Sequence, residues 1–312
     1  MESLQGKRVF IAGHRGMIGS ALVRRLATEQ CDVLTAPRDV LDLLEPSAVK
    51  SYLAREKPDI VVVAAAKVGG ILANDTRPAE FLFENLMIEA NLIHGCHLAD
   101  IQRLLFLGSS CIYPREAPQP IQEASLLTGP LEETNKWYAI AKISGVMLAQ
   151  AYRRQYSRDY ISAMPTNLYG PNDNFNLTSS HVLPALIRKA HDAKIAGVDA
   201  MEIWGSGTPM REFLHVDDCA DALTFLLKNY SEEEHINVGS EEEISIFELA
   251  KLVARIIGFN GEVTRDISKP DGTPRKLMAA DKLRQMGWRP EISLEDGVRT
   301  TYDWFLNNEF RG

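Results

Sequence analysis

The chain of 312 residues has little cysteine, no excess of basic side chains and no long hydrophobic run. Its 4 cysteines, Cys31, Cys96, Cys111 and Cys219, show neither CxxC pairing nor the spacing of metal ligands. This argues against a disulfide framework and against a metal site. The 34 Lys and Arg side chains are outnumbered by 42 Asp and Glu, which gives a formal net charge of −8. A chain of that balance has no general attraction for nucleic acid or for an anionic membrane, so we expect neither as a partner.

Targeting and membrane signals are also missing. No apolar run approaches the ~18 residues that a membrane span needs, and the first residues lack both a hydrophobic signal region and an Arg- and Ser-rich transit pattern. With the cysteine pattern, this predicts a cytoplasmic protein. The hydrophobic share of 45% and the charged share of 24% are typical of a globular protein, and the length predicts two domains or one large one.

The first half of the chain alternates short apolar runs with longer helical patterns. The runs are continuously apolar and β-branched, as expected for strands buried on both faces of a parallel sheet. They cover 8–12, 32–35, 60–65, 104–107 and 160–164, and the helical stretches between them cover 16–29, 46–56, 78–100 and 134–155. This alternation predicts an α/β fold, a doubly wound parallel sheet built from right-handed βαβ units.

After Pro165 the alternation stops, and Gly, Pro and Asn cluster from Gly170 to Asn176. A strand and helix around 213–227 indicate a late return to the sheet, and helices are expected at 246–258 and 294–306. We therefore predict a Rossmann domain over residues 1–166 with a returning segment near 213–238. Residues 167–212 and 239–312 form a smaller mixed α/β domain that binds substrate.

The first chemical signal lies directly after the first strand and opens the first helix. It is Gly13-His14-Arg15-Gly16-Met17-Ile18-Gly19. Glycines at this junction let the backbone turn tightly and approach a pyrophosphate, which the helix N-terminus then stabilises. A purely structural turn is the alternative, but the strand before and the helix after favour dinucleotide binding.

The end of the second strand indicates which dinucleotide binds. An NAD site usually places an acid there, whereas this strand ends in Thr35-Ala36-Pro37-Arg38, with no acid before Asp39. Arg38, together with Arg15, is suited to a 2′-phosphate, so NADP is favoured over NAD. An Arg38 that is only a surface side chain is the alternative.

The second signal is Tyr138 and Lys142, which share one face of a helix at i, i+4. That helix follows the strand ending in Leu107-Gly108-Ser109-Ser110-Cys111, at the carboxyl edge of the sheet where doubly wound folds bind ligands. A nearby ammonium is expected to lower the pKa of the phenol from its usual ~10. With Ser109 on the same substrate oxygen, the set suits proton transfer to a carbonyl oxygen while a hydride reaches its carbon.

Together these motifs resemble the extended short-chain dehydrogenases/reductases, and longer segments resemble one family among them, the GDP-4-keto-6-deoxy-D-mannose 3,5-epimerase-4-reductases, or GDP-L-fucose synthases. The segments are AAAKVGGI at 64–71, LGSSCIYP at 107–114, MPTNLYGP at 164–171, WGSGTPMREFLHVDD at 204–218 and KPDGTPRK at 269–276. They run from the first half of the chain to near its end and are far more specific than the superfamily motifs.

The resemblance implies a bifunctional enzyme that epimerises C3 and C5 of GDP-4-keto-6-deoxy-D-mannose and reduces C4 with NADPH. It assigns Cys111 as base and His181 as acid on opposite faces of the sugar ring, with Ser109, Tyr138 and Lys142 in the reduction. From the residues alone, the favoured interpretation of Cys111 is a buried structural thiol, and that of His181 is a helix-capping or surface histidine. If strand geometry continues to Cys111, this side chain, two residues beyond Ser109, points the same way as that of Ser109.

Further site residues are also implied by the resemblance. Those expected at the cofactor are Gly13 to Gly19, Arg38, Asp39, Leu107, Gly108, Ser110, Lys142, Pro165, Thr166, Asn167, Leu168 and His181. Those expected at the diphosphate, base or sugar are Lys189, Trp204, Arg211, Asp271 and Lys276. Family members are homodimeric, so we expect a homodimer through the helices at 78–100 and 134–155.

Two other functions remain open at this point. Another sugar-nucleotide enzyme, a 4-epimerase or 4,6-dehydratase, would keep its cofactor tightly bound and need no Cys111 and His181 pair. A non-catalytic dinucleotide sensor would usually lack Tyr138 or Lys142, and this chain has both.

Overall fold

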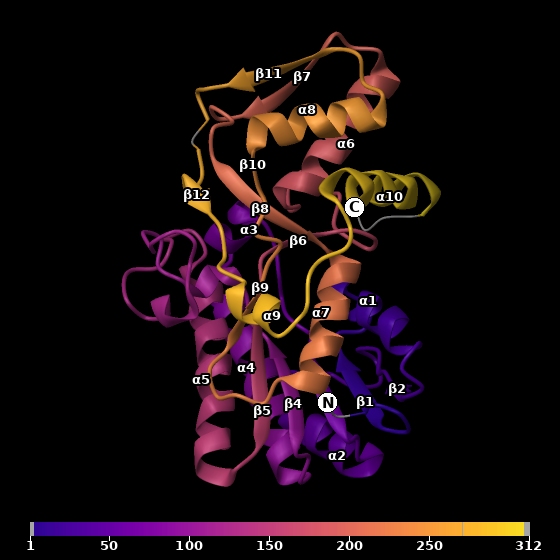
Figure 1. Cartoon of the computed structure of the whole chain (residues 1–312), viewed down its shortest axis with the longest axis vertical. Coiled ribbons are helices and arrows are strands. Elements are labelled where there is room, and N and C mark those ends of the chain that lie inside the picture. Colours follow the sequence, from indigo (N-terminus) through magenta and orange to yellow (C-terminus); the bar gives the residue numbers. More distant parts are fainter. Residues whose placement is uncertain (1–2, 270, 309–312) are drawn as a thin grey trace.

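The computed structural model describes residues 3–269 and 271–308. A large parallel sheet with helices on both faces forms one part, and a smaller mixed region lies above it in Figure 1. No helix in the described part of the chain is long and apolar enough to cross a membrane.

The large sheet has six strands, all parallel, in the order β2-β1-β3-β4-β5-β9. They are β1 Arg8–Ala12, β2 Asp32–Leu34, β3 Ile60–Val63, β4 Arg103–Leu107, β5 Asp159–Pro165 and β9 Ile236–Val238. The helices of this part are α1 Met17–Leu26, α2 Pro46–Glu56, α3 Ile71–Thr76, α4 Pro78–Leu98, α5 Lys136–Tyr156 and α7 Val216–Asn229. The predicted doubly wound fold is confirmed. Because the order reverses at β1, the crevice between the ends of β1 and β3 is the switch point where such sheets bind ligands.

The smaller region is built around β8, Met210–His215, which pairs with β6, β10 and β12. Its other strands are β6 Asn167–Tyr169, β7 Ala200–Trp204, β10 Glu243–Ser245, β11 Glu262–Asp266 and β12 Arg275–Lys276. Its helices are α6 Val182–Ala196, α8 Ile246–Ile257 and α10 Leu294–Asn307, whose apolar faces enclose a separate hydrophobic cluster.

The expected return to the large sheet is correct for the helix and wrong for the strand before it. β8 stays in the smaller sheet, because the chain turns aside after β5 into β6, which lies parallel to β8 with Asn167 opposite Phe213. The strand that returns is β9, which pairs with β5. The segment around α9, Asp281–Gln285, also returns, since Leu283 and Trp288 pack in the core of the large sheet. The domain limits drawn from the sequence stay a prediction.

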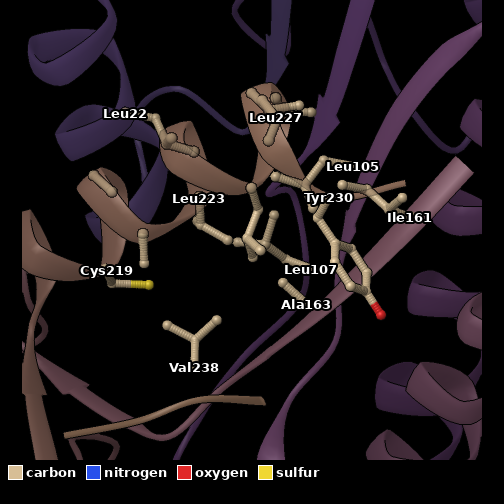
Figure 2. Close-up of a cluster of buried hydrophobic side chains, with 14 of the residues drawn as sticks. Leu22, Leu105, Leu107, Ile161, Ala163, Cys219, Leu223, Leu227, Tyr230 and Val238 are labelled. Carbon is tan, nitrogen blue, oxygen red and sulfur yellow. The ribbon is translucent and has the colours of Figure 1, made fainter. Parts of the chain in front are cut away.

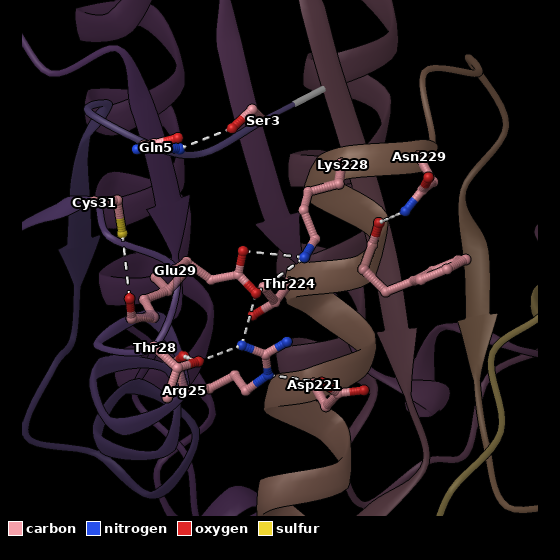
Figure 3. A network of polar contacts seen from close by, with 12 residues as sticks. Ser3, Gln5, Arg25, Thr28, Glu29, Cys31, Asp221, Thr224, Lys228 and Asn229 are labelled. Atoms are coloured by element: carbon pink, nitrogen blue, oxygen red, sulfur yellow. Dashed lines mark hydrogen bonds and ion pairs between the residues drawn. The ribbon is translucent and has the colours of Figure 1, made fainter. Parts of the chain in front are cut away.

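α7 is joined to the N-terminal half by apolar and by ionic contacts. Its buried face, including Leu223 and Leu227, packs with Leu22 and with residues of the sheet such as Leu105 and Ile161 (Figure 2). Along its edge, Arg25 of α1 pairs with Asp221, the Nε–Oδ1 distance being 2.6 Å, and Lys228 pairs with Glu29, the Nζ–Oε1 distance being 2.9 Å (Figure 3). Residues near position 220 are therefore part of the first domain's core.

Candidate active site

The glycine loop lies at the switch point of the large sheet. Gly13 has a φ of +91°, and a Cβ added there would lie 2.6 Å from the backbone nitrogen of Ala65 after β3. A Cβ on Gly19 would lie 2.1 Å from the carbonyl oxygen of Gly13. The two glycines thus let the loop pack on α1 and on the end of β3. Gly16 is the N-cap residue of α1, so the first amides of the helix face the same crevice.

The cations expected at this end of the cofactor lie on the surface. Arg15 in the glycine loop is exposed, as are Arg38 and Asp39 in the turn after β2. His14 is half-buried, and burial followed by the charge of Arg15 lowers its pKa. Met17 and Ile18 begin α1 and are half-buried. The positions of Arg15 and Arg38 are compatible with a phosphate on the ribose.

Ser109 and Cys111 follow β4, but strand geometry does not bring them together. The strand ends at Leu107, and Ser110–Ile112 form one turn of 3₁₀ helix. The Oγ of Ser109 accepts a hydrogen bond from the backbone nitrogen of Cys111 at 3.4 Å, capping that turn. The expected proximity is therefore found, and the physical reason given for it from the sequence was wrong.

Tyr138 and Lys142 reach this turn from α5. The side chain of Ser109 hydrogen-bonds both the Tyr138 phenol and the Cys111 thiol. The Nζ of Lys142 donates to the carbonyl oxygen of Leu107 at 3.0 Å and lies 5.9 Å from the centre of the Tyr138 ring. Four of the five residues predicted as catalytic thus gather at the end of β4.

Glu89 of α4 completes this group and was not found from the sequence. Its Oε1 lies 2.9 Å from the Nζ of Lys142, and both side chains are only 2% exposed. The sequence signal is a lone acid in the apolar run Leu86-Met87-Ile88-Glu89-Ala90, four residues after Asn85, which is also buried. Such a pattern places both polar side chains on the inner face of a helix.

The expected lowering of the Tyr138 pKa is contradicted by the structure. Burial raises the pKa of Tyr138 well above its ordinary value, and the nearby Cys111 and Glu89 raise it further. The hydrogen bond from Ser109 acts in the opposite direction. The physical reason is first the burial of the phenol. In addition, Lys142, the expected source of the lowering, is paired with Glu89.

Lys276 lies on the other side of Cys111. Burial raises the pKa of the Cys111 thiol, and the positive charge of Lys276 is the largest effect that lowers it. The same charge reaches His181, the N-cap residue of α6, whose pKa is lowered first by its crowded surroundings and then by Lys276. His181 is nevertheless exposed to solvent. Arg211 of β8 stands beside Lys276 in the parallel pairing of β8 with β12. The charge of Lys276 therefore acts on both Cys111 and His181, and Arg211 lies beside Lys276.

The other residues expected at the cofactor line the ends of β4 and β5. Gly108 donates to the carbonyl oxygen of Ala163, and Ser110 is buried. Pro165 ends β5, Thr166 is buried, and Asn167 and Leu168 begin β6. They belong to the same carboxyl edge of the sheet as the catalytic group.

A second group of predicted residues lies in the smaller region. The Nζ of Lys189 is 5.5 Å from the centre of the Trp204 ring, and that of Lys269 is 5.7 Å from it. Trp204 is 66% exposed, which leaves its ring open to a ligand. Asp271 accepts hydrogen bonds from the backbone nitrogen and the Oγ of Ser206. Pro270, within the 269–276 segment, lies outside the described residues. No hydrogen bond or ion pair in the described ranges joins this group to Cys111.

In the described part of the chain, no cluster of three or more His, Cys, Asp or Glu side chains is arranged to hold a metal ion.

Comparison with known proteins bears on this arrangement. The sequence profile of the NAD dependent epimerase/dehydratase family matches residues 9–239. A GDP-L-fucose synthase of Sinorhizobium fredii is 60% identical over 308 residues, which are 99% of this chain and 98% of that protein. GDP-L-fucose synthase 1 of Arabidopsis thaliana is 55% identical over 96% of this chain and 94% of its own. The GDP-L-fucose synthase of Escherichia coli is 53% identical over 98% and 99%.

Solved structures agree with these relatives. A GDP-L-fucose synthetase from Naegleria fowleri bound to NADP has a TM-score of 0.91 at 30% identity, covering 99% of this chain and 95% of its own. A GDP-6-OMe-4-keto-L-xylo-heptose reductase from Campylobacter jejuni has a TM-score of 0.91 at 33% identity, covering 98% and 99%. The resemblance stated from the sequence is confirmed: the chain belongs to the GDP-L-fucose synthase family, within the NAD dependent epimerases/dehydratases, the extended short-chain dehydrogenases/reductases.

Proposed function

We propose that the protein is a bifunctional enzyme that converts GDP-4-keto-6-deoxy-D-mannose to GDP-L-fucose, acting as a 3,5-epimerase and then as an NADPH-dependent 4-reductase. The names of relatives that are 53–60% identical over nearly the whole chain support this function. The observation that carries the proposal is the double contact of Ser109, whose side chain hydrogen-bonds both Cys111 and Tyr138. The hydroxyl of Ser109 therefore lies between a thiol that can remove a proton from carbon and a phenol that can donate a proton to a carbonyl oxygen.

The residues at the switch point fit NADP, which would supply the hydride. The backbone approach at Gly13 and the open N-terminus of α1 suit the pyrophosphate. We assign the exposed Arg15 and Arg38 to the 2′-phosphate, and the buried Lys142 to the hydroxyls of the nicotinamide ribose. The similar GDP-L-fucose synthetase from Naegleria fowleri was solved with NADP bound, which supports this choice of cofactor.

Epimerisation requires a base on one face of the sugar and an acid on the other, because the ketone at C4 acidifies the hydrogens on C3 and C5. We assign the base to Cys111. Burial raises the pKa of its thiol, and the charge of Lys276 and the hydrogen bond of Ser109 partly offset this effect. His181 is the acid. Its lowered pKa leaves it neutral near pH 7 without substrate, and the negative charge of a bound diphosphate raises its proton affinity. Because Lys276 acts on both groups, it belongs at the sugar end, and Arg211 at the diphosphate.

Reduction uses the same oxygen. Ser109 holds the C4 oxygen during enolate formation, and Tyr138 donates its phenolic proton to that oxygen as the hydride adds to C4. The phenol is protonated at neutral pH, and it gives its proton to the alkoxide because an alkoxide is the stronger base. Trp204, Lys189 and Asp271 are then left for the nucleotide end of the substrate.

Two variants separate the half-reactions. Cys111→Ala should abolish deuterium exchange from solvent into C3 and C5, and exchange at the wild-type rate would remove Cys111 as the base. Tyr138→Phe should retain exchange while slowing NADPH oxidation by a factor of about 10²–10⁴. NMR of the product formed from GDP-4-keto-6-deoxy-D-mannose and NADPH tests the whole proposal. A 4-epimerase or 4,6-dehydratase would show no net consumption of NADPH, and a sensor would show no turnover.

We also propose a homodimer and a cytoplasmic location. Large apolar side chains are exposed on α4 and α5, namely Phe83, Trp137, Ile140 and Met147, and these two helices pack side by side. An apolar face of this kind fits a second copy of the same helix pair. We expect a mass in solution near twice 34.8 kDa, the mass of one chain. Ile140→Glu should reduce the measured mass to that of a single chain. The free thiols of the four cysteines fit a reducing compartment.

A further inference from the structure

Glu89 is an acid buried beside the reaction site for which the mechanism above has no use. It comes from α4, whereas Lys142 and Tyr138 come from α5. Its carboxylate is 2% exposed, and the Nζ of Lys142 lies 2.9 Å from its Oε1. Burial raises the pKa of Glu89, and the charge and the hydrogen bond of Lys142 oppose that effect. A buried carboxylate with a single charged partner is costly, and the cost needs a reason.

The packing around Glu89 leaves space for the carboxylate. Gly145, one turn beyond Lys142 on α5, faces α4. A Cβ there would lie 2.8 Å from the Oε2 of Glu89 and 2.3 Å from the Cζ of Phe106. The Nζ of Lys142 also lies 4.8 Å from the centre of the Phe106 ring. The ion pair is thus enclosed by an aromatic ring and by a position that admits only glycine without a shift of its neighbours.

We propose that Glu89 is a positioning residue for the reduction: it holds and neutralises the Lys142 ammonium so that Tyr138 keeps its proton until the C4 oxygen takes it. The proposal rests on the function proposed above. The step concerned is transfer of the phenolic proton to the alkoxide that forms as a hydride adds to C4. An uncompensated ammonium beside the phenol would stabilise the phenolate, so that Tyr138 would lose its proton to solvent at a lower pH. The pair of Lys142 and Glu89 has no net charge, whether the proton they share is on the amine or on the carboxylate.

Other charged groups around the phenol do not replace this role. The titratable side chains that face Tyr138 are Cys111 from the turn after β4, Glu89 from α4, Lys142 from its own helix and, beyond Cys111, Lys276 from β12. Lys276 acts on the thiol. Glu89 alone among them lies in contact with Lys142.

The direct test needs no substrate. The ultraviolet absorbance of phenolate is titrated with pH in the wild type and in Glu89→Gln, each paired with a variant that also carries Tyr138→Phe, so that the difference reports Tyr138 alone. We expect Tyr138 to ionise about one pH unit lower or more in Glu89→Gln, a change of at least tenfold in proton affinity. An unchanged titration in a folded Glu89→Gln protein would overturn the proposal.

A control and a second variant complete the experiment. Glu123 is also buried and accepts a hydrogen bond from the backbone nitrogen of Asn237, away from Lys142, so Glu123→Gln should leave the Tyr138 titration unchanged. If Glu89→Gln does not fold, Glu89→Asp keeps the charge at a greater distance and should lower the ionisation by a smaller amount. No shift in Glu89→Asp would then overturn the proposal.

The kinetic readout separates this proposal from the function on which it rests. In Glu89→Gln the alkaline limb of the pH profile for NADPH oxidation should move to lower pH, while exchange at C3 and C5 stays near the wild-type rate. If the wild type does not reduce the 4-keto sugar, the proposed function fails, and the titration of Tyr138 still decides the role of Glu89.

Discussion

Gly13→Ala tests whether the first glycine is required by the fold itself, before any cofactor binds. The added Cβ would lie 2.6 Å and 2.7 Å from the nitrogen and Cα of Ala65, which are backbone atoms and do not move aside cheaply. The φ of +91° adds strain for any residue with a Cβ. Backbone strain costs about 1–2 kcal/mol, and overpacking about 1–3 kcal/mol more. We expect the free energy of unfolding to fall by about 2–5 kcal/mol.

A matched glycine separates strain from contact. Gly287 has a φ of +102°, yet nothing lies within 4 Å of its built Cβ, so Gly287→Ala carries the strain alone. At about 2.1 cal/mol/K of unfolding entropy per residue, a chain of 312 residues loses about 1.5 °C of melting temperature per kcal/mol. We therefore expect losses of about 3–8 °C for Gly13→Ala and about 2–3 °C for Gly287→Ala.

The assay is calorimetry of both variants and the wild type without cofactor. Equal losses in the two variants would refute the argument from the close approach to Ala65, because only strain would then be acting. A loss in Gly13→Ala that appears only when NADPH is present would also refute it, since the clash exists in the protein alone.

Three further substitutions test the choice of cofactor, the pH dependence of stability and a buried hydrogen bond of α4. Arg38→Ala should weaken NADPH binding about tenfold while leaving NADH binding unchanged, as measured by fluorescence titration, and equal effects on both would identify Arg38 as a surface side chain. Burial lowers the pKa of His235 from 6.5 to about 4, so between these values the unfolded chain binds more protons and stability falls as the pH falls. The melting temperature of His235→Gln should therefore depend less on pH between 6.5 and 4 than that of the wild type. Asn85 bonds both the backbone nitrogen and the oxygen of Lys67, at 2.8 Å and 3.0 Å. Asn85→Ala should lower the free energy of unfolding by about 2–4 kcal/mol, and a loss below 1 kcal/mol would mean that water replaces the amide.

Much of the fold followed from periodicity. Continuous apolar runs such as Ile60–Val63 are buried on both faces, and the strands and helices predicted before Pro165 lie within a few residues of their observed limits. The short helix α3 was not predicted. The smaller region was harder, because its strands are two to six residues long and pair across long separations. β8 shows the reason: its sequence is compatible with either sheet, and the neighbour is decided by where β6 lies.

The site was predictable only as far as motifs name its residues. The grouping of Ser109, Tyr138 and Lys142 followed from their positions after β4 and on α5. The pKa of Tyr138 did not, because its direction is set first by burial in the folded protein and then by Cys111 and Glu89. Glu89 lies 53 residues before Lys142 in the chain and shares no motif with it. Local spacing reports which side chains share a face, whereas the sign of an electrostatic effect depends on every charge that tertiary packing brings near.

The contribution of α7 to the first core has a consequence for synthesis on the ribosome. Residues 216–230 supply a continuous face of that core, and β9 pairs with the edge of β5. In a nascent chain that ends near residue 166, the apolar surface under α7 and the edge of β5 are therefore exposed. Domains normally fold as units in the order in which they are made. Because Leu283 and Trp288 also pack in this core, the cofactor domain must wait until about residue 288 has emerged, by which time β6 to β8 are already present. The part that is first in sequence is thus completed only after the strands of the second part have been made.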